Sequence, residues 1–211
     1  MNNASHIKTI FNKYASSYQE QYMSVDLYKA SLDDFCNHIS KEKASVLDVG
    51  CGPGNVTKHL LNQRPDFNVL GVDIAQNMIA LAQENNPLAN FKVMDALDIK
   101  QLKNKYNGIV CAFLFPYLSK EKAIEFIALL SDLLEKNGAL YISTMEDLNT
   151  NSKFQGASHD KNDRLFINYH EMGYLTDALK ENGLDIVLST QQEFPQKDGS
   201  ITTDLILIAK K

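Results

Sequence analysis

The chain has 211 residues, of which 44% are hydrophobic and 22% charged, the balance of a globular protein long enough to bury one sizeable core. This composition excludes a collagen-like, coiled-coil or largely disordered chain. Acidic residues outnumber basic ones by 26 to 21, which gives a net charge of −5. Such a chain has no positive field for gathering nucleic-acid phosphates or anionic lipids, so neither nucleic acid nor a membrane is expected as a partner.

Three cysteines, Cys36, Cys51 and Cys111, are widely spaced and form no C-x-x-C pair. No disulfide framework or metal site is therefore expected, and a reducing, cytoplasmic location fits best. The first ten residues contain no apolar core of a secretory signal, and the longest strongly apolar run, 109–115, is far too short to span a bilayer.

The predicted elements alternate between helices and strands from residue 44 onward. The first forty residues have helical periodicity, and their apolar positions would form one face. Further along the chain, we expect strands at 44–49, 67–72, 91–94, 108–113 and 139–144, and helices around 56–61, 74–82 and 126–134. The third of these helices precedes Asn137-Gly138, a typical helix C-cap pair.

The last third of the chain begins with a polar stretch of little periodicity. Residues 146–164 are predicted to form a long loop, and residues 146–166 are a possible lid. A helix over 172–179 and strands at 184–188 and 204–209 complete the chain. This pattern predicts one α/β domain, in which a largely parallel sheet has helices on both faces and ligands bind at the carboxyl ends of the strands.

The first strand leads into a glycine-rich turn, Val46–Gly54, with the spacing G-x-G-x-G. The dinucleotide fingerprint G-x-G-x-x-G would need its third glycine at Asn55. The carboxylate of Asp48 would repel a pyrophosphate, and Pro53 removes one N–H from a phosphate cradle. The turn therefore favours a cofactor with a nucleoside and positive charge but no phosphate, such as S-adenosylmethionine.

Two further acidic residues follow the next two strands. Asp73 can accept hydrogen bonds from both ribose hydroxyls, although enzymes that use NAD employ the same device. Asp95 could accept a hydrogen bond from the adenine amino group. Together with the glycine turn, these positions favour a nucleoside ligand over ordinary turn residues.

The sequence resembles the class I S-adenosylmethionine-dependent methyltransferases, small-molecule type, over roughly residues 11–183. The segments that match the family's motifs, in order, are 46–54, 71–78, 94–96, 110–118 and 134–142. The resemblance implies a Rossmann-like seven-stranded sheet of order 3-2-1-4-5-7-6, with the last strand antiparallel. It also implies that residues 1–40 form a helical cap over the cofactor.

The resemblance, together with the motifs, assigns twelve residues to S-adenosylmethionine and its product S-adenosylhomocysteine. They are Tyr14, Tyr18, Asp48, Gly50, Cys51, Gly52, Asp73, Ile74, Met78, Asp95, Ala96 and Phe113. The two tyrosines share one helix face and could direct their hydroxyls at the methionine carboxylate. Packing of the same rings onto the core is the alternative.

The methyl acceptor is expected to be a small molecule. The segment Cys111–Tyr117 lacks the [DNS]-P-P-[YFW] motif of amino-directed DNA methyltransferases, and no Pro-Cys pair occurs for cytosine chemistry. Its aromatic residues suggest a partly desolvated pocket. His170 is the candidate general base, with capping or packing as its alternative role.

Two other functions stay open at this point. An NAD(P)-dependent oxidoreductase is disfavoured by Asn55 and Asp48, and a non-catalytic protein that binds an adenosine ligand is compatible with the same motifs. The sequence does not identify the acceptor, the accepting atom (O, N, C or S), the need for a base or the oligomeric state.

Overall fold

The computed structural model describes residues 4–146, 153–157, 160–195 and 201–211. Seven strands form one sheet of order β3-β2-β1-β4-β5-β9-β8, which confirms the predicted order. Their bounds are β1 Ser45–Val49, β2 Asn68–Asp73, β3 Asn90–Val93, β4 Tyr106–Ala112, β5 Leu134–Glu146, β8 Asp185–Pro195 and β9 Ile201–Lys210. Only β9 runs against the other six strands of this sheet, as its antiparallel pairing with β5 and β8 shows.

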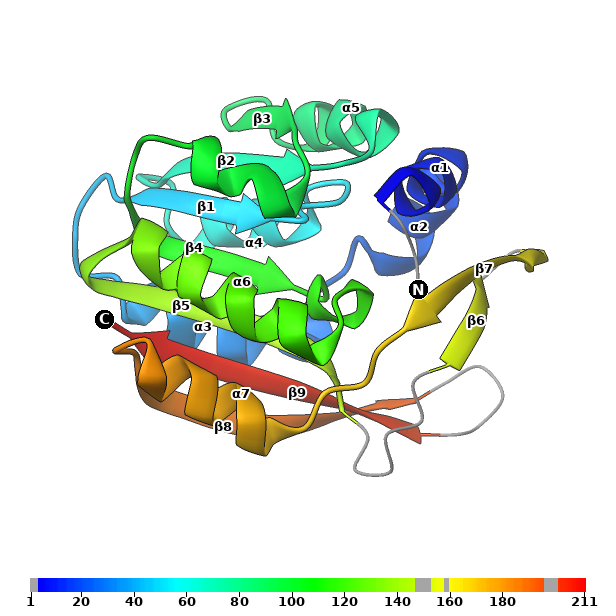
Figure 1. Ribbon diagram of the computed structural model, residues 1–211. Coiled ribbons are helices and arrows are strands. Elements are labelled where there is room, and N and C mark those ends of the chain that lie inside the picture. Colours follow the sequence, from blue (N-terminus) through cyan, green and yellow to red (C-terminus); the bar gives the residue numbers. More distant parts are fainter. Residues whose placement is uncertain (1–3, 147–152, 158–159, 196–200) are drawn as a thin grey trace.

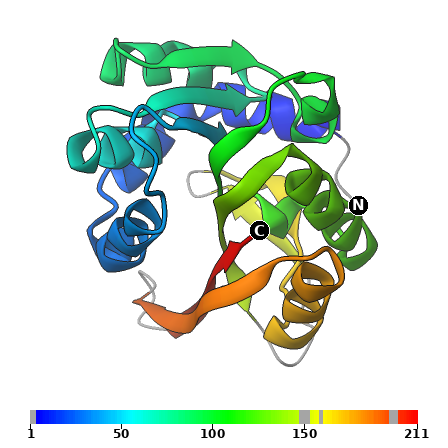
Figure 2. The ribbon, with the colours of Figure 1, turned by 90° about the vertical axis from the view of Figure 1, so that its left-hand side faces the viewer.

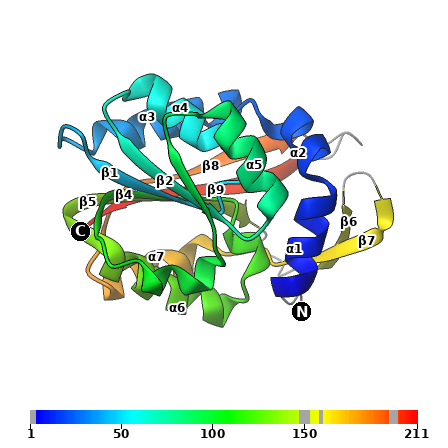
Figure 3. The same cartoon turned by 90° about the horizontal axis from the view of Figure 1, so that it is seen from above.

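Helices cover both faces of this sheet, as Figures 1 and 3 show. On one face lie α3 (Lys29–Asn37), α4 (Asn55–Gln63) and α5 (Gln76–Asn85); on the other lie α6 (Lys120–Leu133) and α7 (Met172–Glu181). The central strands β1 and β4 are mostly apolar, as expected of strands that have both faces buried. The predicted α/β class with a Rossmann-like sheet is confirmed.

Each helix layer packs through one apolar stripe. On the α6 face, Phe126, Ile127 and Leu130 lie at helical spacing and are fully buried against the sheet. On the α3 face, Phe35 packs with the ring of Tyr141 from β5, with centroids 6.0 Å apart. These two apolar layers hold the sheet in one position, so the strand ends become fixed points for a site.

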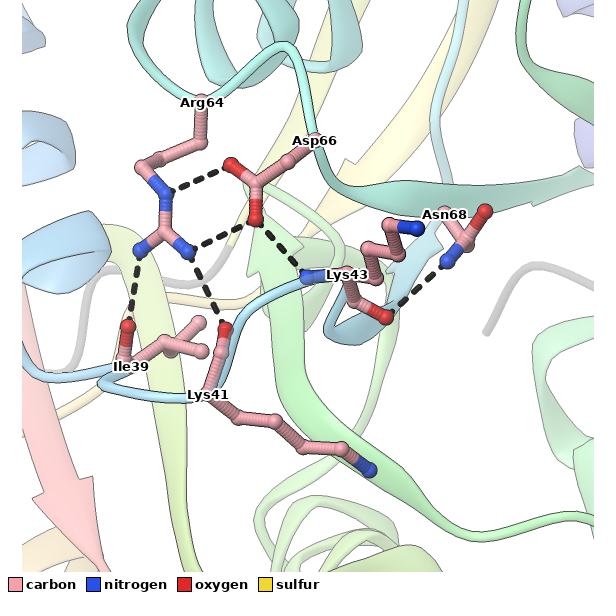
Figure 4. Close-up of polar contacts among 6 residues, drawn as sticks. All are labelled: Ile39, Lys41, Lys43, Arg64, Asp66 and Asn68. Atoms are coloured by element: carbon pink, nitrogen blue, oxygen red, sulfur yellow. Dashed lines mark hydrogen bonds and ion pairs between the residues drawn. The ribbon is translucent and has the colours of Figure 1, made fainter.

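A polar cluster closes the amino-terminal end of the sheet, the end that faces the viewer in Figure 2. The guanidinium of Arg64 donates to both carboxylate oxygens of Asp66 and to the carbonyls of Ile39 and Lys41 (Figure 4). The backbone N–H of Lys43 also donates to Asp66. This cluster joins the loop before β1 to the loop before β2, far from the carboxyl ends of the strands.

The amino-terminal segment lies across the carboxyl ends of the strands (Figure 1). It consists of α1 (Ala4–Lys13), α2 (Ala15–Tyr22) and a 3-10 turn, η1 (Asp26–Tyr28). The side chain of Asn12 bonds Asn77 of α5, and Gln19 accepts from Asn85 at the end of α5. The expected helices in the first forty residues are confirmed, and they are tied to α5.

The polar stretch after β5 differs from its prediction. In place of a long loop, the structure has an antiparallel hairpin of β6 (Lys153–Ala157) and β7 (Asp160–Ile167). The expectation was wrong because strand pairing, not hydrophobic periodicity, defines this hairpin. The rest of the predicted lid, residues 147–152 and 158–159, lies outside the described residues.

The predicted C-cap at Asn137-Gly138 is also wrong. Helix α6 ends at Leu133, and Leu134 already has extended dihedral angles and pairs with Tyr106 of β4. Asn137 has a positive φ of 65°, but its N–H donates to the carbonyl of Lys211 at the end of the chain. Leu134 is fully buried in the sheet, so the helix ends before it and not at the predicted cap residues Asn137 and Gly138.

We predict that Gly71→Ala destabilises the protein. A Cβ atom on Gly71 would lie 2.5 Å from the ring of Phe91 and 3.0 Å from the sulfur of Cys51. Overpacking of this kind costs about 1–3 kcal/mol, to be measured by urea denaturation. Gly173→Ala in α7, where nothing lies within 4 Å, is the matched control and should keep or raise stability. Equal stability of the two variants would contradict the packing argument.

Candidate functional site

The glycine turn after β1 forms a tight backbone loop at the carboxyl end of the sheet. Gly50 and Gly52 have φ angles of 73° and 52°, in the left-handed region that residues with a Cβ rarely adopt. The N–H groups of Gly50 and Cys51 both donate to the carbonyl of Val72, at 2.8 and 3.0 Å. The loop is therefore bonded to the end of β2.

Asp73, the last residue of β2, reinforces the same junction. One of its carboxylate oxygens accepts from the N–H of Gly52 at 3.0 Å, and the other accepts from the N–H of Ala75 at 2.8 Å. Burial raises the pKa of Asp73, and these backbone donors oppose the shift. Asp73 also lines the adjoining cavity and is partly exposed.

A cavity of about 370 Å³, called here the first cavity, opens beside this loop. It brings together most of the residues predicted from the motifs. These are Tyr18, Gly50, Gly52, Asp73, Ile74, Met78, Asp95, Ala96 and Phe113. Asp95 additionally caps the short turn after β3, because its carboxylate accepts from the N–H of Leu97 at 2.9 Å.

Aromatic rings from the amino-terminal helices cover the loop. The Tyr18 ring comes within 3.8 Å of the position that a Cβ on Gly52 would occupy. Phe11 packs edge-on against both Tyr18 and Tyr117, with centroids 5.9 and 5.4 Å apart, and Tyr22 lies 4.6 Å from Tyr18. These rings form a wall over one side of the loop.

A second cavity, of about 320 Å³, adjoins the first. The two cavities share six lining residues: Tyr18, Gly50, Gly52, Ala112, Phe113 and Tyr117. The predicted residues Asp48 and Cys51 line the second cavity and not the first. Each volume is within the usual range for small-molecule sites, about 300–1,000 Å³.

Asp48, near the carboxyl end of β1, is a buried carboxyl group at this second cavity. It is 1% exposed, and the hydroxyl of Thr57 donates to it at 2.7 Å. Burial raises the pKa of Asp48 to about 6; Thr57 opposes this shift, and the nearby Asp73 adds to it. A cation beside such a buried carboxyl group stabilises its ionised form.

Phe113 holds an unusual backbone conformation where the two cavities meet. Its φ is 55°, which costs a bulky side chain about 1–2 kcal/mol. Its N–H donates to the carbonyl of Ser143 at 2.9 Å, and its ring packs edge-on against Tyr28, 5.1 Å away. Strained residues of this kind collect at functional sites.

Tyr14, a predicted cofactor residue, lies outside both cavities. The hydroxyl of Tyr14 donates to Asp163 of the hairpin at 2.6 Å, and Tyr14 lines neither cavity. The adjacent Lys13 makes an ion pair with the same carboxylate. The kink between α1 and α2 separates the two tyrosines, because Tyr14 is the residue that joins these helices and does not continue one of them.

His170 is buried and lines neither cavity. Its Nε2 donates to the carbonyl of Phe115 at 2.8 Å, and its Nδ1 accepts from the hydroxyl of Tyr174. Burial lowers the pKa of His170. Because both ring nitrogens have partners in the protein, the ring fits the packing role, and the structure gives no support to its expected role as a base.

Four polar residues at the second cavity were missed by the sequence analysis: Tyr28, Tyr141, Ser143 and Asp204. The sequence held a usable signal for Asp204. It directly precedes the apolar run of β9 and is the one charged residue of this strand before Lys210. The other three belong to ordinary helical or apolar patterns. Pairing of β5 with β9 brings Tyr141, Ser143 and Asp204 together, and the hydrogen bond from Tyr28 to Asp204 adds η1.

Comparison with known proteins finds methyltransferases. Residues 46–138 match the family model described as a methyltransferase domain. A putative methyltransferase of Invertebrate iridescent virus 6 is 32% identical over 61% of this chain and 45% of its own length. The chain spans 65% and 43% of two further curated relatives, so it covers about half the length of these proteins.

Solved structures show the same fold. The magnesium protoporphyrin IX methyltransferase of Synechocystis PCC 6803 with bound S-adenosylhomocysteine gives a TM-score of 0.73 at 18% identity, over 100% of both chains. The 1,6-didemethyltoxoflavin-N1-methyltransferase of Burkholderia thailandensis gives 0.73 at 19% identity, over 99% of this chain and 88% of that one.

Over residues 46–138 the chain matches a methyltransferase domain, and its fold is that of solved S-adenosylmethionine-dependent methyltransferases, in agreement with the resemblance found in the sequence. The Synechocystis enzyme has been solved with S-adenosylmethionine and with S-adenosylhomocysteine, which agrees with the predicted cofactor. Within the described ranges, no helix is long and apolar enough to cross a membrane, and no cluster of three potential metal ligands occurs.

We predict that Asp48 makes the stability of the ligand-free protein depend on pH. Its pKa rises from 3.8 to about 6 on folding, so between these values the folded state binds more protons than the unfolded state. The free energy of unfolding contributed by this group therefore falls as the pH rises. From pH 7 to pH 5, the wild type should gain about 1 kcal/mol relative to Asp48→Asn in urea denaturation. Parallel pH curves for the two proteins would contradict a raised pKa.

Proposed function

We propose that this protein binds S-adenosylmethionine between its two cavities and transfers the methyl group to a small molecule. The observation that carries the proposal is the placement of Asp73, whose carboxylate fixes the glycine loop and also lines the first cavity. When bound, the cofactor supplies a methyl group on a positively charged sulfur. The protein's part is to position both reactants and exclude water.

The first cavity fits the nucleoside part of the cofactor. Asp73 would accept hydrogen bonds from the ribose hydroxyls, and Asp95 from the adenine amino group. Ile74, Met78 and Ala96 supply apolar surface for the purine ring. No phosphate cradle is needed, in agreement with Pro53 in the loop.

The second cavity fits the charged part of the cofactor and the acceptor. The buried carboxyl of Asp48 would attract the ammonium group, whose charge would favour the ionised form of this residue. The loop residues Gly50 and Gly52, together with Tyr18, belong to both cavities, so one ligand can extend from the first into the second.

Two considerations support a small acceptor, and a third concerns the compartment. The cavities are lined largely by aromatic and apolar side chains, and aromatic rings of the amino-terminal segment cover them. The net charge of −5 disfavours nucleic acid. The three cysteines are buried free thiols, which favours a reducing, cytoplasmic compartment.

The alternative of an NAD(P)-dependent oxidoreductase finds no support here. A pyrophosphate would meet the carboxyl of Asp48, and Asn55 stands where the dinucleotide fingerprint has glycine. A non-catalytic protein that binds S-adenosylmethionine would share every cofactor contact described above. Transfer of labelled methyl groups separates this alternative from an enzyme.

We predict that S-adenosylhomocysteine binds in isothermal titration calorimetry and that Asp73→Ala weakens the binding at least tenfold. The variant loses charge-assisted hydrogen bonds, each worth about 1.5–3 kcal/mol. Asp132→Ala, at an exposed position of α6, is the matched control and should bind as the wild type does. Unchanged affinity in folded Asp73→Ala, or tighter binding of NAD, would overturn the proposal.

A further inference from the structure

The second cavity has a distinct charge pattern. Two of its lining residues are buried carboxyl groups, Asp48 and Asp204, and no Lys, Arg or His lines it within the described part of the chain. Asp48 lies next to the glycine loop, whereas Asp204 comes from β9, on the far side of β5. An anionic acceptor would therefore meet two carboxyl groups and, among the residues that the structure describes, no positively charged side chain.

Asp204 is held in one orientation by a polar network. The hydroxyl of Tyr28 donates to it at 2.6 Å. The hydroxyl of Ser31 donates to the carbonyl of Tyr28 at 2.9 Å and lies 3.1 Å from the hydroxyl of Tyr141. Asp204 is only 3% exposed, and burial raises its pKa to about 6, against the opposing effect of Tyr28. This network accounts for one side of the carboxyl group, and the cavity lies on another.

A second, independent observation indicates a polar ligand in the same place. The side-chain oxygen of Ser143 is fully buried at this cavity and has no hydrogen-bond partner in the described structure. Ser143 pairs with Ile206 in the sheet, and Met145 pairs with Asp204, so Ser143 and Asp204 extend from the same face. Buried hydroxyl groups are normally paired, so this one marks polar surroundings that the protein itself satisfies only weakly, next to the hydroxyl of Tyr141.

Aromatic rings form the rest of the wall. Tyr22, Tyr28, Phe113 and Tyr117 line this cavity, together with Phe194 from β8. The faces of such rings attract cations, most strongly where water is excluded. A buried carboxyl group, a buried hydroxyl group and aromatic rings are the surroundings that suit an ammonium group.

We propose that the methyl acceptor is an amine, which Asp204 binds as its ammonium form and then deprotonates. This inference rests on the proposed function. The carboxylate of Asp204 takes one N–H proton, which leaves a lone pair on the nitrogen. That lone pair forms the N–CH₃ bond while the S–CH₃ bond of the donor breaks and its electron pair stays on sulfur. The products are a methylated ammonium ion and neutral S-adenosylhomocysteine, and Asp204 later releases its proton to water.

The test measures binding without relying on turnover. Benzylamine, benzyl alcohol and benzoate share a ring and differ in the charge of one group. Their binding to the protein saturated with S-adenosylhomocysteine can be followed by ligand-observed NMR and calorimetry. We expect benzylamine to bind at least tenfold more tightly than benzyl alcohol, and benzoate not to bind.

Variants then locate the effect. Asp204→Asn keeps the shape of the side chain and should weaken benzylamine at least tenfold, while S-adenosylhomocysteine affinity changes less than threefold. Tyr28→Phe removes the hydroxyl that orients Asp204 and should weaken benzylamine less. Asp185→Asn, at an exposed position at the start of β8, is the matched control and should behave as the wild type.

Three outcomes would overturn the inference: benzoate binding as well as benzylamine, no benzylamine binding to the loaded protein, or unchanged benzylamine binding in Asp204→Asn. None of them affects the cofactor. Failure of S-adenosylhomocysteine to bind the wild type would instead overturn the proposed function. Methyl transfer to a panel of amines and matched carboxylic acids then extends the result, with amines alone expected to be methylated.

Discussion

The hydrogen bond from the N–H of Gly52 to the carboxylate of Asp73 is the constraint on which the site depends. It joins the loop after β1 to the end of β2, where Gly50 and Cys51 already bond Val72. A loop of glycines would otherwise lose much conformational entropy on binding a ligand. Because the parallel strands fix both of its ends, the loop has its binding shape before any ligand arrives.

The rest of the fold supports this junction from two sides. The polar cluster around Arg64 closes the amino ends of the strands, and the two helix layers bury both faces of the sheet. The carboxyl ends remain as the place where backbone and polar side chains are left for ligands. The rings of Phe11, Tyr18 and Tyr117 then shield that end from water.

Local signals in the sequence predicted most strands of the sheet and the residues that gather at the first cavity, because both depend on short stretches of chain. Strand β1, its glycine turn and Asp73 are separated by fewer than thirty residues, and parallel strands bring their ends together by rule. Leu134 and the β6–β7 hairpin were mispredicted, since strand pairing there overrides the local pattern. Asp204 and Tyr28 are 176 residues apart, and no local pattern could indicate their hydrogen bond.

The contact of Tyr14 and Lys13 with Asp163 has a consequence for how ligands enter and leave. It joins the amino-terminal helices to the β6–β7 hairpin, although Lys13 and Asp163 are 150 residues apart in the sequence. Tyr18, whose ring covers the glycine loop, follows directly on the next helix turn. Displacing that ring therefore strains the exposed ion pair between Lys13 and Asp163. Dissolved salt weakens such a pair by screening its charges. The exchange rate of the bound nucleoside should consequently increase with ionic strength, even though no charged residue of this contact touches either cavity.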